Sequence, residues 1–310
     1  MLNNLSIITT LYNSSAYVEE FYRRITASAQ KVATSYTIIF VNDGSPDDSF
    51  AKACALQKQD GHVEVVNLSR NFGHHKAIMT GIELARGDYT FVIDVDLEEE
   101  PELLESFADE IQKSECEIVF GVQHQRKGDI FERLSGTIFY KVFNFFSSTK
   151  IPENVVMARL FSRPYREELL KFSEADFFLA GVTELVGFKQ KIVSVVKHGN
   201  RHSSYSFLRR LDLMVDAITS FTGRPLYALF YIGALLFLLD LVFITYLFAK
   251  YIMFGVLPGW TSIVASVWFF GALIMFSIGL VGIYLSKIFI EVKQRPRSIV
   301  AEHIRKDSDL

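Results

Sequence analysis

Residues Gly87–Pro101 read GDYTFVIDVDLEEEP, and this stretch decides the fold. Tyr89–Ile93 is a short aromatic and β-branched run, which predicts a buried strand. The strand delivers Asp94 and Asp96 at its carboxyl end, which is where ligands bind in an open α/β sheet. Together with Glu98, these side chains offer hard oxygen ligands that suit Mg²⁺ or Mn²⁺ bridging a diphosphate. Taken alone, an Asp-x-Asp pattern also fits a strand followed by a solvated, acidic helix start.

Three further apolar runs precede this strand and predict an α/β sheet. They are residues 5–11, 36–41 and 63–68, and each leads through a polar loop into a helical pattern. Strands that alternate with helices favour a mostly parallel, Rossmann-like sheet with helices on both faces. Asn13 and Asp43 follow the first two strands, so we expect them to converge with the Asp94–Asp96 pair on one ligand. Asp43 is expected to accept hydrogen bonds from a base or ribose, although Asn-Asp-Gly alone is often only a turn.

Two long apolar runs predict membrane-spanning helices. The chain has 310 residues, of which 50% are hydrophobic, and the excess is concentrated near the carboxyl end. Residues 226–249 contain only one charged side chain, Asp240, and the predicted second span, 261–288, is uncharged as far as Ser286. Each run exceeds the roughly 20 residues that a spanning helix needs. Residues 250–260 form the predicted extracytoplasmic loop. Asp240 is either a functional residue or a polar contact between helices.

Basic residues flank both runs and predict their orientation. They are Arg209, Arg210, Arg224, Lys287, Lys293, Arg295 and Arg297, whereas the connecting loop has only Lys250. The positive-inside rule therefore places both termini in the cytoplasm, with residues 289–310 as a basic tail. The amino end lacks the pattern of a cleavable signal, so we expect the part before the first span to remain cytoplasmic. The net charge of -3 is uninformative about nucleic acid, and no basic domain implies nucleic acid as a partner.

Two amphipathic stretches are predicted near the membrane. In residues 129–143 the apolar positions share one helical face, and Arg133 and Thr137 lie on another. This stretch is either a core helix with a basic edge or an interfacial helix whose Arg133 and Thr137 meet a lipid phosphate. Residues 203–225 repeat the pattern and predict a juxtamembrane helix along the cytoplasmic leaflet. Cys54 and Cys116 are predicted to be buried thiols.

Five motifs in order and spacing resemble family 2 glycosyltransferases of GT-A fold. They are Tyr12-Asn13, Val41-Asn42-Asp43-Gly44-Ser45, Arg70-Asn71-Phe72-Gly73, Ala85-Arg86-Gly87-Asp88, and Asp94-Val95-Asp96-Leu97 with Pro101-Glu102. More narrowly, the chain resembles polyprenyl-phosphate glycosyltransferases related to dolichol-phosphate mannose synthase. That branch includes bacterial enzymes that load sugars onto undecaprenyl phosphate, and it has members with two carboxyl-terminal transmembrane helices. The resemblance therefore covers nearly the whole chain.

The resemblance implies a GT-A catalytic domain over residues 1–202 and a multi-pass enzyme of the bacterial inner membrane. It would transfer a sugar, with inversion, from a nucleotide diphosphate to polyprenyl phosphate. The donor would contact Thr10, Tyr12, Asn13, Asp43, Arg70, Asp94, Val95 and Asp96. A divalent metal, Mg²⁺ or Mn²⁺, would be held by Asp94, Asp96 and Glu98. Arg133, Thr137 and Arg201 would meet the acceptor phosphate, and Asp94, Asp96, Arg133 and Arg201 would carry catalysis. A homo-oligomer is plausible because apolar and amphipathic helices are paired.

Departures from the family pattern keep two alternatives open. Thr10, Ser14, His74, Glu98, Gln123 and Met157 each replace a usual family residue, and the later basic motif is shortened to residues 201–205. The acid missing at Met157 keeps open a transferase that extends a lipid-linked saccharide, for which Asp176 or Glu174 could serve as the base. The other alternative is a non-catalytic nucleotide-sugar-binding or scaffold protein of the membrane.

Overall fold

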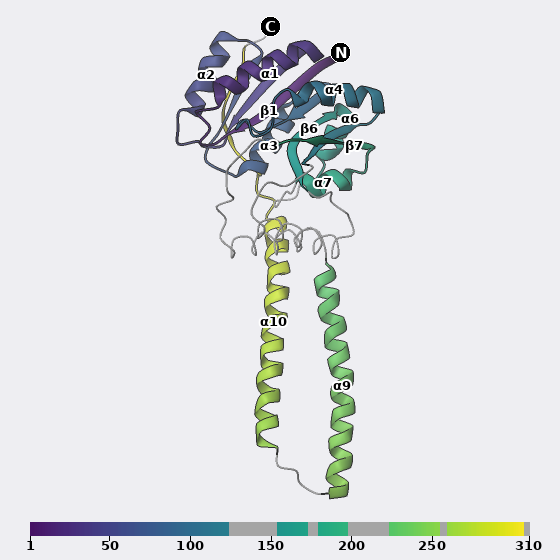
Figure 1. The fold of residues 1–310 in the computed structure, drawn as a ribbon. Coiled ribbons are helices and arrows are strands. Elements are labelled where there is room, and N and C mark those ends of the chain that lie inside the picture. Colours follow the sequence, from purple (N-terminus) through teal and green to yellow (C-terminus); the bar gives the residue numbers. More distant parts are fainter. Residues whose placement is uncertain (124–153, 173–178, 198–222, 255–258, 307–310) are drawn as a thin grey trace. The chain divides into compact units, whose positions relative to one another are not determined.

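The computed structural model describes residues 1–123, 154–172, 179–197, 223–254 and 259–306. These residues form two compact units. The first is an α/β domain that includes the carboxyl-terminal residues from Arg295 onward, and the second contains two long helices (Figure 1). The predicted amphipathic segment 129–143, and residues 203–222 of the predicted juxtamembrane helix, lie outside the described residues.

The first unit is built on an eight-stranded sheet in the order β7-β5-β6-β4-β1-β2-β3-β8. The strands are β1 (Leu2–Leu11), β2 (Ala33–Asn42), β3 (Val63–Leu68), β4 (Tyr89–Val92), β5 (Ile118–Gln123), β6 (Val155–Ser162), β7 (Gln190–Val195) and β8 (Val300–Ile304). The central strands β3, β2, β1 and β4 are parallel, and β7 is parallel to β5. β6 runs antiparallel to both β4 and β5, and β8 runs antiparallel to β3. The predicted mostly parallel sheet is therefore confirmed.

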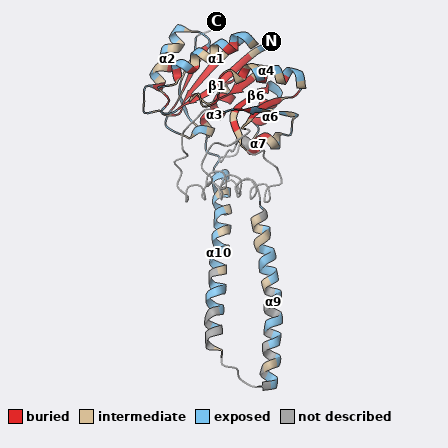
Figure 2. Ribbon diagram, viewed as in Figure 1, coloured by how far each residue is buried: buried red, intermediate tan, exposed pale blue. Residues whose placement is uncertain are grey.

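Helices cover both faces of this sheet, as the alternation of strands and helices predicts. They are α1 (Val18–Val32), α2 (Ser49–Gln59), α3 (His74–Leu84), α4 (Leu103–Ser114), α6 (Arg163–Leu169) and α7 (Leu179–Val186). On one face, Phe21 of α1 meets Phe40 of β2, and Phe107 of α4 meets Phe91 of β4, each edge to face at 6.1 Å. These rings belong to one buried cluster, and the strands of the sheet are largely buried (Figure 2).

On the other face, α3 packs directly against the central strands. A Cβ on Gly81 would lie 2.4 Å from Cγ2 of Ile8 and 3.1 Å from Cγ2 of Val41. Only glycine therefore permits this close approach of α3 to β1 and β2. Since α3 begins directly after the loop that follows β3, its packing fixes the start of the helix at the carboxyl edge of the sheet.

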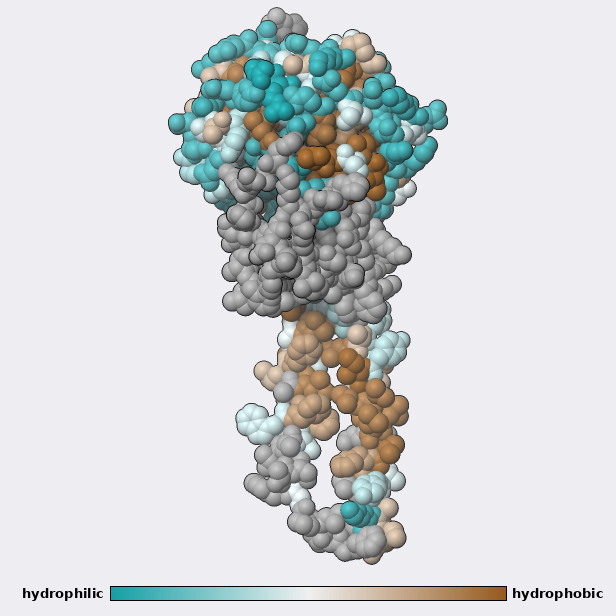
Figure 3. All heavy atoms as spheres, viewed as in Figure 1, coloured by the Kyte–Doolittle hydropathy of each residue, from teal (hydrophilic) through white to brown (hydrophobic). Residues whose placement is uncertain are grey.

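The second unit holds the helices α9 (Arg224–Phe254) and α10 (Trp260–Val292). Residues Ser266–Val292 of α10 are long and apolar enough to cross a membrane, and within α9 the described residues contain a shorter apolar stretch, Pro225–Leu236. Large apolar side chains on both helices are exposed (Figure 3). One of the two predicted spans thus has a qualifying helix among the described residues, while the second span stays a prediction.

One boundary differs from the sequence-based expectation. Residues 289–310 were expected to form a basic tail, but α10 continues to Val292, and Val300–Ile304 form strand β8 of the sheet. Strand β8 is short and mostly exposed, so its formation depends on backbone pairing with β3 and not on an apolar pattern.

Candidate functional site

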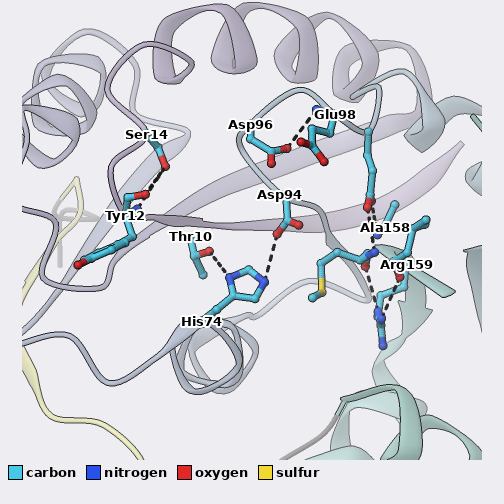
Figure 4. Close-up of polar contacts among 12 residues, drawn as sticks. Thr10, Tyr12, Ser14, His74, Asp94, Asp96, Glu98, Ala158 and Arg159 are labelled. Atoms are coloured by element: carbon cyan, nitrogen blue, oxygen red, sulfur yellow. Dashed lines mark hydrogen bonds and ion pairs between the residues drawn. The ribbon is translucent and has the colours of Figure 1, made fainter. Parts of the chain in front are cut away.

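The Asp-x-Asp stretch forms a tight loop at the carboxyl end of β4. The Ile93 amide donates to the Ile8 carbonyl of β1 at 3.2 Å, which extends the strand pairing up to the loop. Leu97 then adopts a left-handed backbone with φ of 59°, and the Glu98 amide donates to Oδ1 of Asp96 at 3.1 Å. These contacts hold Asp94 and Asp96 at the ligand-binding edge predicted from the sequence (Figure 4).

His74 links Asp94 to the end of β1. Its Nε2 lies 3.3 Å from Oδ1 of Asp94, and its Nδ1 lies 3.0 Å from the Thr10 hydroxyl (Figure 4). Burial and, to a smaller extent, the negative charge of Asp96 raise the pKa of Asp94 to about 7. Burial lowers the pKa of His74. The imidazole, which stands where the family usually has lysine, therefore orients the first carboxylate of the pair.

A second acidic pair continues the loop and shares one lysine. The Glu99 side chain is only 1% exposed, and its two oxygens accept from the amides of Met157 at 3.0 Å and Ala158 at 2.7 Å. Lys197 Nζ lies 3.0 Å from the Glu98 carboxylate and 3.8 Å from that of Glu99. Burial, followed by the charge of Asp94, raises the pKa of Glu99. Glu99 therefore ties the acidic loop to β6.

Arg159 places a buried positive charge behind these carboxylates. Its guanidinium donates to the carbonyls of Met157 and Val156 and to the Thr183 hydroxyl, at 3.0, 3.2 and 3.3 Å. Burial lowers the pKa of Arg159, while the charges of Glu99 and Asp94 favour its protonated form. Arg159, Glu99 and Lys197 were not among the predicted site residues. Arg159 lies two residues after Met157, one of the departures from the family pattern, and Glu99 lies in the acidic run, but no sequence signal pointed to Lys197.

Asp43 organises the loop after β3, on the side of the edge predicted to bind the donor. Its two carboxylate oxygens accept from the amides of Phe72 at 2.7 Å and Gly73 at 3.0 Å. The aspartate thereby holds Ser69–Gly73, which we call the donor loop. Burial raises the pKa of Asp43, against the effect of these two hydrogen bonds. Each carboxylate oxygen keeps a second lone pair, so Asp43 can still accept from a ligand.

The turn after β2 and the donor loop are in close contact. Gly44 has φ of 63°, and a Cβ on it would lie 2.6 Å from the Asn71 nitrogen and 2.7 Å from the Arg70 carbonyl carbon. Arg70 stacks over the Phe72 ring, with its guanidinium carbon 4.1 Å from the ring centroid. The loop therefore presents a cation next to the carboxyl end of the sheet.

The structure brings part of the predicted site together. Thr10, Asp94, Asp96 and Glu98 lie around one edge (Figure 4), and Val95 is buried beneath it. Tyr12 is half exposed, and Asn13, with φ of 51°, donates its amide to Ser45. The predicted acceptor-phosphate residues Arg133, Thr137 and Arg201, and the possible bases Glu174 and Asp176, lie outside the described residues. Their roles stay predictions.

The predicted metal site is a cluster of oxygen donors without a preformed cage. Within the described ranges, no group of three or more His, Cys, Asp or Glu side chains is arranged to hold a metal ion. Glu98 is paired with Lys197, whereas Asp94 and Asp96 lie at the loop edge. Mg²⁺ is usually bound through one or two carboxylates together with water and substrate phosphates. Two carboxylates therefore fit such a site, and three protein ligands are not required.

Comparison with known proteins identifies the family. The model of glycosyl transferase family 2 matches residues 6–172, more than half of the chain, so the chain belongs to glycosyl transferase family 2. A glycosyltransferase of Mycobacterium tuberculosis is 42% identical over 96% of this chain and 87% of its own length. A prophage bactoprenol glucosyl transferase homolog of Escherichia coli is 30% identical over 96% and 98%.

A further relative has a similar name, and a solved structure shares the fold. The prophage-derived bactoprenol glucosyl transferase of Shigella flexneri is 29% identical over 97% of this chain and 98% of its own. Glucosyl-3-phosphoglycerate synthase of M. tuberculosis, solved with phosphoglyceric acid, has a TM-score of 0.51 at 17% identity and covers 71% of this chain and 80% of that one. The predicted GT-A-like fold and the suspected family are confirmed.

Proposed function

We propose that this enzyme transfers a sugar from a nucleotide-diphosphate sugar to polyprenyl phosphate, with undecaprenyl phosphate as the carrier. The proposal rests on how much of each chain the sequence similarity covers. The E. coli and Shigella relatives named for bactoprenol align over 98% of their own lengths and at least 96% of this chain. The alignment therefore extends beyond the catalytic domain into the two apolar helices, which a soluble sugar transferase would not need.

The residues predicted to bind the donor support a nucleotide-diphosphate sugar as the donor substrate. Asp43 and the donor loop stand beside the Asp94–Asp96 pair at the carboxyl edge of neighbouring parallel strands, where nucleotides bind in open α/β sheets. Asp43 offers its remaining lone pairs to a base or ribose. The Arg70 guanidinium offers positive charge to the diphosphate.

Asp94 and Asp96 are the residues that we expect to hold a divalent metal. Burial and then the charge of Asp96 raise the pKa of Asp94, so a cation held by these two carboxylates would be favoured there. When bound, Mg²⁺ or Mn²⁺ would neutralise charge on the leaving diphosphate. We place Glu98 outside the ligand set because it is paired with Lys197. His74 keeps Asp94 oriented, and Glu99 keeps the loop fixed to β6.

Catalysis would then depend mainly on positioning and electrostatics. The phosphate of the acceptor is already anionic at neutral pH, so its attack on the anomeric carbon needs no strong base. Arg133, Thr137 and Arg201 are proposed, from the family resemblance, to bind that phosphate and to offset its repulsion from the donor. The family resemblance also implies inversion at the anomeric carbon.

The two long helices support a location in the bacterial inner membrane. Ser266–Val292 has the length and composition of a span, and apolar side chains such as Phe230, Trp268 and Phe276 are exposed to the surroundings. Lipid would remove these side chains from water. We propose two spans with the catalytic domain and both termini on the cytoplasmic side, where nucleotide sugars are available. Self-association of the helices stays a prediction.

The decisive experiment supplies purified enzyme in detergent with undecaprenyl phosphate, Mn²⁺ or Mg²⁺, and separate UDP-, GDP- and dTDP-sugars. Mass spectrometry should find a lipid whose mass equals lipid phosphate plus one glycosyl unit. The Asp96→Ala variant should yield none, whereas Asp109→Ala, an exposed change on α4, should behave as wild type.

Two other outcomes separate the alternatives. Transfer only to a lipid-linked saccharide would contradict the phosphate acceptor and favour a base near Asp176. Nucleotide-sugar binding with neither transfer nor slow metal-dependent hydrolysis would favour the non-catalytic protein. The replacement of the usual family acid by Met157 is the observation that keeps the saccharide-extending transferase in the test.

A further inference from the structure

The chain returns from α10 to the catalytic domain and joins its sheet. Residues 297–304, which we call the C-terminal strap, include β8, and β8 pairs antiparallel with β3. The register runs from Val65 opposite Ile304 to Leu68 opposite Val300, with an irregularity between Asn67 and Leu68. The strap therefore reaches the carboxyl end of β3, at the point where the donor loop begins.

The end of the strap nearest the donor loop is bonded to it and to α3. The Ser69 amide, the first of the donor loop, donates to the Ile299 carbonyl at 2.9 Å. The hydroxyls of Ser298 and Thr80 lie 2.6 Å apart, and the Thr80 hydroxyl also donates to the Lys76 carbonyl at 2.9 Å. Because the Thr80 hydrogen is directed to Lys76, Ser298 is the donor to Thr80.

Arg297 anchors the same end of the strap to two other elements. Its guanidinium donates to the Phe172 carbonyl and lies 3.5 Å from the Glu83 carboxylate of α3. The Arg297 side chain is 13% exposed and that of Glu83 is 51% exposed, so solvent partly screens this ion pair. The strap nevertheless contacts α3 at two positions, Thr80 and Glu83, and α3 starts at the residue that follows the donor loop.

The donor loop is thus held from two sides. On the inner side, Asp43 accepts from Phe72 and Gly73, and Gly44 leaves no room for the loop to move inward. On the outer side, Ile299 accepts from Ser69. With its outer contacts broken, the loop would keep its inner contacts and gain freedom to swing away from the sheet edge.

We propose that the C-terminal strap positions the donor loop for nucleotide binding, with Ser298 as the positioning residue that locks α3 and the loop together. The role in binding rests on the proposed function, in which the donor loop contacts the nucleotide diphosphate. A purely structural role is the simpler alternative, because a strand that covers the edge of β3 also protects that edge from pairing with other chains. If the strap positions the donor loop, only contacts at its end near residue 297 should affect nucleotide binding. If it only protects the edge of β3, contacts at both of its ends should have the same effect.

The far end of the strap provides the matched control. Nε2 of His303 lies 2.8 Å from the Glu64 carboxylate, and His303 is opposite Val66, inside the β3–β8 pairing. Removing this contact should loosen the strap without reaching the donor loop. Ser298→Ala removes the bond to Thr80 but leaves Thr80 donating to Lys76, so no buried hydroxyl hydrogen loses its acceptor. Ser298→Thr keeps the hydroxyl.

Two measurements on the full-length protein in detergent test the proposal. Hydrogen exchange of the amides of residues 69–73, without nucleotide, should be faster in Ser298→Ala than in wild type, Ser298→Thr or His303→Ala. The dissociation constants of UDP, GDP and dTDP, each with Mn²⁺, should rise on the order of fivefold in Ser298→Ala for whichever nucleotide binds wild type. His303→Ala should lower the melting temperature but leave nucleotide affinity unchanged.

The outcomes distinguish failure of the strap from failure of the proposed function. If exchange in residues 69–73 is the same in Ser298→Ala and wild type, the strap does not position the loop. Equal losses of nucleotide affinity in Ser298→Ala and His303→Ala would mean that the strap only protects the edge of β3 and does not position the donor loop. If wild type binds none of the nucleotides, the proposed donor is wrong, while the exchange measurement still decides whether the strap holds the loop.

Discussion

Replacement of Gly44 by alanine is the most direct test of the geometry of the donor side. Gly44 has φ of 63°, and an alanine Cβ would lie 2.6 Å from the Asn71 nitrogen. A left-handed backbone costs an alanine about 1–2 kcal/mol, and the stiffer unfolded chain returns about 0.4–1 kcal/mol. The backbone term alone is therefore about 1 kcal/mol of lost stability.

The steric term is larger and acts on the donor loop. Ordinary contact begins at 3.4 Å, so the loop backbone must move by about 0.8 Å, the difference between 3.4 and 2.6 Å. A shift of that size along the Asp43 hydrogen bonds would carry them from 2.7 and 3.0 Å to roughly 3.5 and 3.8 Å, beyond effective range. Hydrogen bonds to a charged group contribute about 1.5–3 kcal/mol each. We therefore expect Gly44→Ala to weaken nucleotide-diphosphate binding at least tenfold.

Gly187 provides a control with similar backbone strain and no clash. Its φ is 75°, and the nearest atom to an added Cβ would be the Leu185 oxygen at 3.8 Å. Gly187→Ala should lower the melting temperature by about 2–4 °C, the shift expected for 1 kcal/mol in a domain of this size, and leave nucleotide affinity unchanged. Titration calorimetry with Mn²⁺ and thermal unfolding would measure both variants. Wild-type nucleotide affinity in Gly44→Ala, or an equal loss in both variants, would refute the reasoning.

Three further predictions concern the acidic loop. Asp96→Ala should abolish metal-dependent transfer while the melting temperature stays within a few degrees of wild type, and retained activity would remove Asp96 from the site. Glu98→Gln should keep metal affinity within about threefold, because Lys197 already occupies that carboxylate; a loss as large as that of Asp96→Ala would make Glu98 a ligand. The pKa of Asp94 is raised from 3.8 to about 7 by burial and by Asp96, so between these pH values the native state binds more protons than the unfolded state. The free energy of unfolding should therefore fall as pH rises through this window, by about 4 kcal/mol at most. Asp94→Asn should be more stable than wild type at pH 8 but similar at pH 4. If denaturant titrations give the same difference in stability between Asp94→Asn and wild type at pH 4 and at pH 8, the raised pKa of Asp94 is not the cause of that difference.

The central strands could be predicted because each is buried on both faces and therefore reads as a continuous apolar run. Strand β1, for example, is buried at nearly every position from Leu5 to Leu11. The edge strands carry no such signal. In β7 and β8 most positions are exposed or only partly buried, so these strands are held by backbone pairing. The amino-acid composition of a segment does not reveal such pairing. For this reason residues 300–304 were expected to be part of a tail.

The same distinction, between a local sequence pattern and a contact set by the strand order, applies to the site residues. Asp94 and Asp96 could be placed from the sequence because they follow directly on a buried strand, so the local pattern sets their position. Lys197 could not, because its contact with Glu98 depends on the strand order β7-β5-β6-β4. That order brings the loop after β7 to the loop after β4, and it includes antiparallel β6, which the alternation of strands and helices does not predict.

The electrostatics of the acidic loop link its stability to its proposed ligand. Four carboxylates, those of Asp94, Asp96, Glu98 and Glu99, lie within one loop, and among the described residues Lys197 forms ion pairs with only the last two. Asp94 has the His74 imidazole beside it, and burial, followed by the charge of Asp96, raises its pKa to about 7. We expect a cation that arrives with the diphosphate to relieve the repulsion between Asp94 and Asp96. Mn²⁺ should then raise the melting temperature of wild type more at pH 8 than at pH 5, because at pH 5 protonated Asp94 competes with the metal. An equal rise at both pH values would place the metal away from Asp94.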